Sequence, residues 1–122
     1  MPQYLISFNE GAMRHIPAAD FPAVGQAAAA VVLDAIEAGV YLFAGGLLEP
    51  NTMTIVATDG TVAHGPDPAC RDFIGGFTVV EVASREEAHR WAARIAAACR
   101  CAQHVREFMP LPPQVEARIR RG

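Results

Sequence analysis

The sequence predicts an α+β fold in which an antiparallel sheet carries two helices on one face. Its 122 residues, 52% of them hydrophobic, suffice for one buried core. With that apolar content and a net charge of only -3, disorder is excluded. The predicted elements follow the order strand-helix-strand, hairpin, strand-helix-strand. Two similar halves of this kind form the ferredoxin-like split βαβ pattern.

The first half begins with a strand at residues 3–8, a short run of strand-forming side chains. A loop follows, in which Asp20 is a suitable N-cap and Pro22 a proline of the first helical turn. The helix is predicted over residues 23–38, with Gly39 ending it. A second strand is expected from residue 40.

The second half starts after a hairpin whose strands flank an Asp-Gly turn at residues 59–60. Alternation of side chains predicts a strand at residues 74–82. Ser84 with Glu87 forms a capping box, which predicts a helix that reaches about Cys99. The last strand is expected at residues 105–109. Residues 1–110 therefore form one domain, and residues 111–122 a short charged tail.

The strand at residues 74–82 is apolar on both of its faces. Phe77 and Val79 point to one side, and Val80 and Val82 to the other. Because two helices cover only one face of the sheet, the second apolar face needs another partner. We therefore expect a homodimer that pairs the sheets of two subunits.

Composition removes several classes of function. All ten basic residues are arginines, so lysine Schiff-base chemistry and pyridoxal-phosphate catalysis are excluded. The net charge of -3 argues against nucleic-acid binding. Polar residues and glycines interrupt the long apolar stretch at residues 23–48, so we expect no membrane span. We also expect no cofactor.

Three cysteines and no recognisable signal peptide predict a reducing, cytoplasmic location. Cys99 and Cys101 are separated by one residue, a spacing that does not favour disulfide geometry, and we expect free thiols. A partial zinc site with His104 is the alternative. Zinc sites space their cysteine pairs by two to four residues, so we expect no metal.

The densest group of polar side chains lies in the loop after the hairpin. There, His64 is the candidate base, and Asp67 or Asp72 is the carboxylate that orients its ring. Arg71 is the candidate that holds an anionic group of a ligand through a bidentate contact. The alternative is a solvated loop in which Arg71 and Asp72 form an ordinary ion pair.

Two further residues are candidates for ligand binding. His15 lies in the first loop beside Arg14. Such loops flank the mouth of a cleft in folds of this kind. Arg106, in the last predicted strand, can face the same cleft. The alternatives are an exposed loop histidine and a surface or interface salt bridge.

The segment from the hairpin to the last strand resembles the YCII-related proteins of the DGPF subgroup. The resemblance is carried by the Asp-Gly turn, by His-Gly-Pro-Asp at residues 64–67 and by Arg-Asp-Phe-Ile-Gly-Gly-Phe at residues 71–77. The helix at residues 84–93 and Val-Arg at residues 105–106 extend it. This resemblance implies the dimeric α+β barrel, in which small ferredoxin-like subunits pair sheet against sheet.

The chain departs from the pattern of these relatives at residues that matter for activity. The subgroup's Asp-Gly-Pro-Phe has His64 in place of its Asp and Asp67 in place of its Phe. In the founding branch of the wider family, a helix histidine paired with an aspartate is the suspected catalytic dyad. That histidine would fall near Ala28, so the dyad does not carry over to this chain.

Two functional hypotheses remain open. In the first, a cofactor-free enzyme performs proton transfer, isomerisation or elimination on a small organic molecule, a reading that rests on fold analogy. In the second, the dimer binds a small ligand or a partner protein without chemistry, in signalling or transcriptional control. The geometry of the pocket discriminates between them, because an enzyme needs His64 or His15 to converge with a carboxylate on an enclosed cavity.

Overall fold

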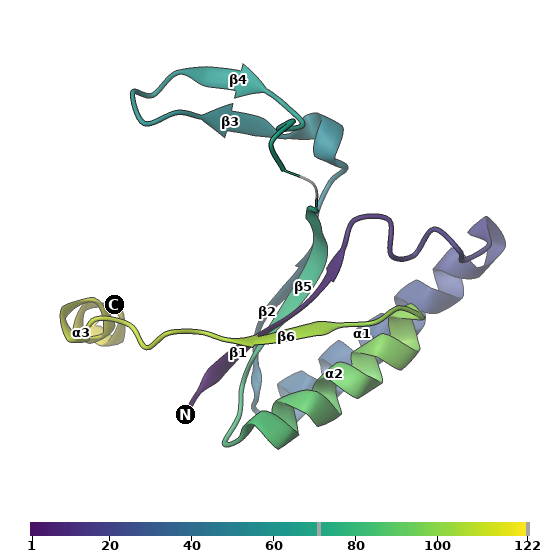
Figure 1. Cartoon of the computed structure of the whole chain (residues 1–122). Coiled ribbons are helices and arrows are strands. Elements are labelled where there is room, and N and C mark those ends of the chain that lie inside the picture. Colours follow the sequence, from purple (N-terminus) through teal and green to yellow (C-terminus); the bar gives the residue numbers. More distant parts are fainter. Residues whose placement is uncertain (71, 122) are drawn as a thin grey trace.

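A four-stranded antiparallel sheet forms the centre of the molecule. The computed structural model describes residues 1–70 and 72–121. The strands lie in the order β2-β5-β1-β6, which is the ferredoxin-like arrangement predicted from the element order (Figure 1). Their bounds are Gln3–Asn9 for β1, Tyr41–Gly46 for β2, Ile74–Glu81 for β5 and His104–Glu107 for β6.

Helices α1 (Phe21–Glu37) and α2 (Arg85–Cys99) lie together on one face of this sheet (Figure 1). The 3-10 turn η1 (Ala18–Asp20) leads into α1. The helix ends before Gly39, whose φ of 75° belongs to the left-handed region that glycine tolerates. The predicted helix bounds are therefore confirmed to within two residues.

Helical periodicity places five residues of α1 on one face, but only three of them are buried. Val24, Val31 and Ala35 are buried, whereas Ala27 and Ala38 are exposed. The stretch Ala18–Glu37, with mean hydropathy 1.3, is long and apolar enough to cross a membrane on those two measures. Core helices share this property, and three side chains of α1 lie in the core.

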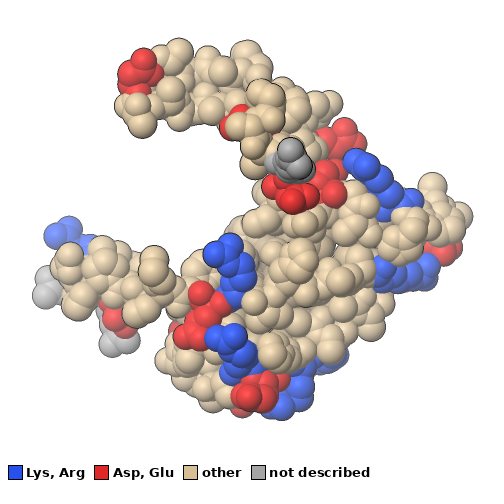
Figure 2. Space-filling view, viewed as in Figure 1, with Lys and Arg blue, Asp and Glu red and all other residues tan. Residues whose placement is uncertain are grey.

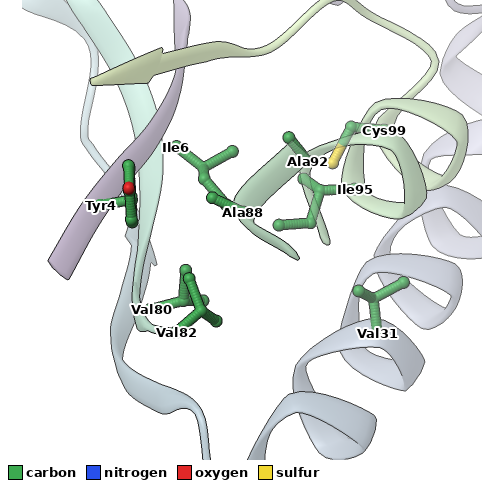
Figure 3. Packing of buried hydrophobic residues seen from close by; sticks show 9 residues of the cluster. All are labelled: Tyr4, Ile6, Val31, Val80, Val82, Ala88, Ala92, Ile95 and Cys99. Atoms are coloured by element: carbon green, nitrogen blue, oxygen red, sulfur yellow. The ribbon is translucent and has the colours of Figure 1, made fainter. Parts of the chain in front are cut away.

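The core is built mainly between the sheet and α2. Ile6 of β1 and Val80 and Val82 at the end of β5 are fully buried. Figure 3 shows them opposite four residues of α2, whereas α1 supplies Val31 to this cluster from farther away. The nine residues of the cluster are Tyr4, Ile6, Val31, Val80, Val82, Ala88, Ala92, Ile95 and Cys99. Fewer side chains of α1 than of α2 therefore reach this core.

The N-terminus of α2 carries the predicted cap. The hydroxyl of Ser84 accepts a hydrogen bond from the backbone N–H of Glu87 at 3.2 Å. In return, the Glu87 carboxylate accepts from the backbone N–H of Ala83 at 3.4 Å. The backbone N–H groups of Glu87 and Ala83 are thus both satisfied, which confirms the capping box. Its second bond comes from Ala83, one residue before the cap residue Ser84.

Two ion pairs join the helices to each other. The Arg94 guanidinium of α2 donates to the Asp34 carboxylate of α1. At the other end, Arg100 donates to Asp20 at 2.8 Å. Asp20 stands at the predicted N-cap position of α1, but its carboxylate makes no capping bond and is used in this pair instead. The ion pairs therefore fix α1 against α2.

The predicted hairpin projects from the body of the molecule (Figure 1). Its strands β3 (Thr54–Val56) and β4 (Val62–His64) form a separate two-stranded sheet behind the 3-10 turn η2 (Pro50–Thr52). We call residues 49–70 the hairpin arm. Asp59 holds its turn by accepting hydrogen bonds from the backbone N–H and the hydroxyl of Thr61.

A second projection follows β6. Residues 108–121 leave the sheet as an extended segment and end in helix α3 (Pro113–Arg121), which stands apart from the body in Figure 1. We call residues 108–121 the C-terminal arm. The tail is therefore helical over most of its length.

The face of the sheet opposite α1 and α2 carries apolar side chains. In β5, Phe77 and Val79 are half-buried, whereas Thr78 and Val80 on the helix side are buried. The register pairs Val79 with Leu5 and with Phe43, so these residues share the open face. The rings of Phe43 and Phe77 lie 5.8 Å apart. The two apolar faces predicted for this strand are confirmed.

Candidate functional site

A cavity of about 600 Å³ lies between α1 and the sheet. On the helix side, its wall includes the small residues Gly25, Ala28 and Ala29, which follow one another at helical spacing. An ideal Cβ built on Gly25 would meet no atom within 4 Å. The cavity exists because this part of α1 has too little side-chain volume to fill the space above the sheet.

The aromatic ring of Phe8 forms the end wall of the cavity. The ring lies directly against β5, where a Cβ on Gly76 would be 2.7 Å from its Cζ atom. A Cβ on Gly75 would be 3.2 Å from the same ring and from the backbone of Glu10. The pairing of β1 with β5 also shifts register at this point. An irregularity in strand pairing and a close approach of the Phe8 ring therefore coincide at the two glycines.

The cavity lining is almost entirely apolar, and none of the described residues that form it is charged. Polar groups come from Tyr41, Thr78, Cys99 and Gln103; the remaining lining residues are Phe8, Met13, Phe21, Val24, Gly25, Ala28, Ala29, Val32, Leu33, Ala44, Gly45, Gly46, Phe77 and Ile95. Such a lining favours an apolar ligand with few polar substituents.

The Cys99 thiol is the nucleophilic group among these residues. Burial raises its pKa, and the nearby Cys101 raises that pKa further. The thiol therefore stays protonated at neutral pH, where the thiolate is the reactive form. All three cysteines are free, as predicted. Cys99 is thus part of the apolar wall and is not an activated nucleophile.

A second, more polar cavity of about 510 Å³ adjoins the first. The two share Phe8, Met13 and Phe21 as walls. The second cavity is lined in addition by Glu10 and Arg14, among other polar residues. The apolar cavity is therefore followed by a polar cavity whose walls carry both negative and positive side chains.

The structure places the predicted catalytic residues at a different site. His64 is exposed at the end of β4, on the hairpin arm. The carboxylate of Asp67 accepts a hydrogen bond from the backbone N–H of Ala69 at 2.9 Å, and Asp72 is exposed. None of the three lines either cavity between β1, β5 and α1. Their catalytic role stays a prediction.

The three predicted ligand-binding residues are likewise spread over the molecule. Arg71 lies outside the described residues. His15 is exposed in the loop before α1, beside Arg14 of the polar cavity. Arg106 is exposed on β6, where the register pairs it with Leu5 of the open sheet face. His15 and Arg106 do not line the apolar cavity.

One feature of the sequence is consistent with the apolar cavity. Gly25, Ala28 and Ala29 form a stripe of small residues on a helix that lies on a sheet. Ala28, near which the family's helix histidine would fall, is on this wall. Within the described residues, no three His, Cys, Asp or Glu side chains are placed to hold a metal ion.

The chain was compared with protein families, curated proteins and solved structures. The 5-chloro-2-hydroxyhydroquinone dehydrochlorinase TftG from Burkholderia phenoliruptrix AC1100, solved in complex with 2,5-dihydroxybenzoquinone, is similar at 16% identity and a TM-score of 0.44. The alignment covers 89% of this chain and 94% of that chain. No curated protein matches. The model of the YCII-related domain matches residues 24–111. Because this match spans most of the chain, the protein belongs to the YCII-related family.

Proposed function

We propose that the protein binds a small, mainly apolar organic molecule in the cavity between α1 and the sheet. The observation that carries this proposal is the cavity of about 600 Å³ with its apolar lining. Ligand pockets in proteins typically measure about 300–1,000 Å³ and combine apolar walls with a few polar groups. Here Tyr41, Thr78 and Gln103 offer hydrogen bonds to a polar substituent of the ligand.

Binding without chemistry accounts for this lining better than catalysis does. Proton transfer, isomerisation or elimination needs a base or acid within hydrogen-bond reach of the substrate. The described wall carries no histidine or carboxylate. It includes Ala28, near which the resemblance to the family would place the helix histidine. The enzymatic alternative instead places the reaction at His64 with Asp67, on the hairpin arm, or with Asp72, just beyond it.

The proposal includes a homodimer that pairs the open faces of two sheets. Phe43 on this face is 59% exposed although it contacts the ring of Phe77. An apolar sheet face of this kind is characteristic of an interface. Light scattering should give about twice the 13.0 kDa of one chain. A mass of one chain at micromolar concentration would refute the dimer. The three free thiols support a reducing, cytoplasmic location.

Two neighbouring alanines of α1 provide a matched test of the cavity. Ala29 lines the cavity, whereas Ala30, also exposed on α1, does not. Ala29→Phe should fill the cavity mouth, and Ala30→Phe adds the same side chain outside it. The probe is anilinonaphthalene sulfonate, whose fluorescence rises in apolar pockets. Mass spectrometry of metabolites retained after incubation with a cell extract then identifies the ligand.

We expect Ala29→Phe to weaken probe binding at least tenfold and to abolish metabolite retention, while Ala30→Phe leaves both unchanged. Equal effects of the two variants, or no effect of either, would overturn the proposed binding site. His64→Ala should leave retention unchanged. If His64→Ala instead blocks conversion of the retained metabolite, the enzymatic alternative holds.

A further inference from the structure

The hairpin arm and the C-terminal arm are both too small to be stable in isolation. The hairpin arm pairs three residues on each of its strands, and two-stranded hairpins are only marginally stable in water. Helix α3 has nine residues, fewer than the roughly 12–15 at which isolated helices become stable. Each arm therefore needs a surface to pack on.

The molecule exposes far more surface than a chain of its mass normally does. Its accessible surface is 8576 Å² at 13.0 kDa, compared with about 6300 Å² expected for a compact monomer of this mass. The excess is about 2200 Å² per chain. Two chains that buried it against each other would have an interface of the size found in obligate dimers, roughly 2,000–5,000 Å².

Each arm presents apolar side chains on one side. The hairpin register pairs Val56 with Val62, so the two valines share a face, and they are 65% and 57% exposed. In the C-terminal arm, Leu111 and Ile119 are 48% and 62% exposed. These two residues line a groove of about 710 Å³ between α3 and the edge of the sheet near Gln3. The groove is large enough to accept the side chains of a two-stranded hairpin.

The net charges of the two arm sequences differ in sign, although the charged residues that line the groove itself are Glu81, Glu107 and Glu116. Residues 49–70 include Glu49, Asp59 and Asp67 and no lysine or arginine. Residues 108–121 include three arginines and one glutamate. Figure 2 shows the arms on either side of a deep hollow, with acidic atoms at the tip of the hairpin arm and both basic and acidic atoms on the C-terminal arm. In one chain the arms are held apart, so their exposed apolar side chains are free to contact a second copy.

We propose that the hairpin arm of each subunit docks into the groove beside the C-terminal arm of its partner. Val56 and Val62 then pack on Leu111 and Ile119 in this groove. A two-fold axis between the arms repeats the contact, as an isologous interface requires. This inference rests on the proposed homodimer and adds to it a reciprocal clasp outside the paired sheets.

The first test compares two exposed isoleucines in the full-length chain. Ile119 lies on α3 and is 62% exposed, and Ile36 lies on α1 and is 51% exposed. We expect Ile119→Asp to raise the dissociation constant of the dimer at least tenfold, measured by analytical ultracentrifugation. Ile36→Asp, the same change outside both arms, should leave it within about twofold. Equal dissociation constants for the two variants would overturn the clasp.

The second test traps the contact between chains. In a Cys70→Ser background, which removes the exposed thiol, Val62→Cys in one chain is mixed with Ile119→Cys in another. Mild oxidation with copper phenanthroline and oxygen should give a covalent heterodimer. Ile36→Cys paired with Val62→Cys is the control and should give none.

Light scattering on the same samples separates the two ways of failing. A dimeric protein that yields no link between positions 62 and 119 overturns the clasp and leaves the homodimer intact. A monomeric protein overturns both.

Discussion

Replacing Gly76 with alanine should drive a methyl group into the ring of Phe8. The added Cβ would lie 2.7 Å from Cζ and 2.9 Å from Cε1 of this ring, and 3.2 Å from the carbonyl oxygen of Gly45. Ordinary van der Waals contacts of a Cβ are about 3.5–4.0 Å. The ring must therefore move by nearly 1 Å, while the carbonyl on the neighbouring strand blocks an escape in the other direction.

Overpacking of this kind costs about 1–3 kcal/mol of unfolding free energy. For a chain of this size, that corresponds to roughly 4 °C in thermal midpoint per kcal/mol. Gly45→Ala is the matched control, because a Cβ on Gly45 has its nearest neighbour at 4.0 Å, in the Phe43 ring. Both variants are unfolded in urea at one protein concentration, since dimerisation makes apparent stability depend on concentration.

A double-mutant cycle then assigns the cost to Phe8. Phe8→Leu shortens the side chain and frees the space that the new methyl group needs. The double variant should therefore lose less unfolding free energy than the two single variants lose together. We expect a coupling of about 1 kcal/mol. If Gly76→Ala costs no more than Gly45→Ala, or if the cycle shows additive effects, the packing account of the two glycines is refuted.

Three further outcomes follow from other parts of the molecule. Ser84→Ala should lower the unfolding free energy by about 1 kcal/mol in chemical denaturation, because it removes the acceptor for the Glu87 N–H. Gly25→Ala should raise that free energy by about 0.5–1 kcal/mol in the same assay, since its Cβ meets no atom within 4 Å and alanine favours the helix. With iodoacetamide at pH 8, exposed Cys70 should be alkylated first. Burial raises the pKa of Cys99 above its ordinary 9.0, so its alkylation in the folded protein should begin only at higher pH, and mass mapping that finds both modified at one rate would contradict this.

The fold was predictable because its signals are local and repeated. Alternation in residues 74–82, the Asp-Gly turn and the capping residues Ser84 and Glu87 each determine one element. The order of those elements then leaves few topologies for the sheet. Helical periodicity is a weaker guide where side chains are small. Ala27 and Ala38 fit the helical period but are exposed, because burying one methyl group contributes little free energy to the orientation of a helix.

The apolar cavity was not predictable in the same way. Sequence reasoning looks for side chains with chemistry, and it selected His64, Asp67 and Arg71 for that reason. The cavity instead results from missing side-chain volume at Gly25 and Ala28, a property of two packed elements together. A helix rich in small residues can pack closely on a sheet or leave a gap above it. The sequence of the helix is compatible with both arrangements.

The position of α1 is set more by α2 than by the sheet beneath it. Its contacts are mostly with α2, and the Arg94–Asp34 pair that joins the two helices is about half exposed. Dissolved salt weakens exposed ion pairs of this type. We therefore expect the packing of α1 on α2, and with it the gap under α1, to respond to ionic strength. An uncharged ligand in that gap would consequently show salt-dependent affinity, although it carries no charge of its own.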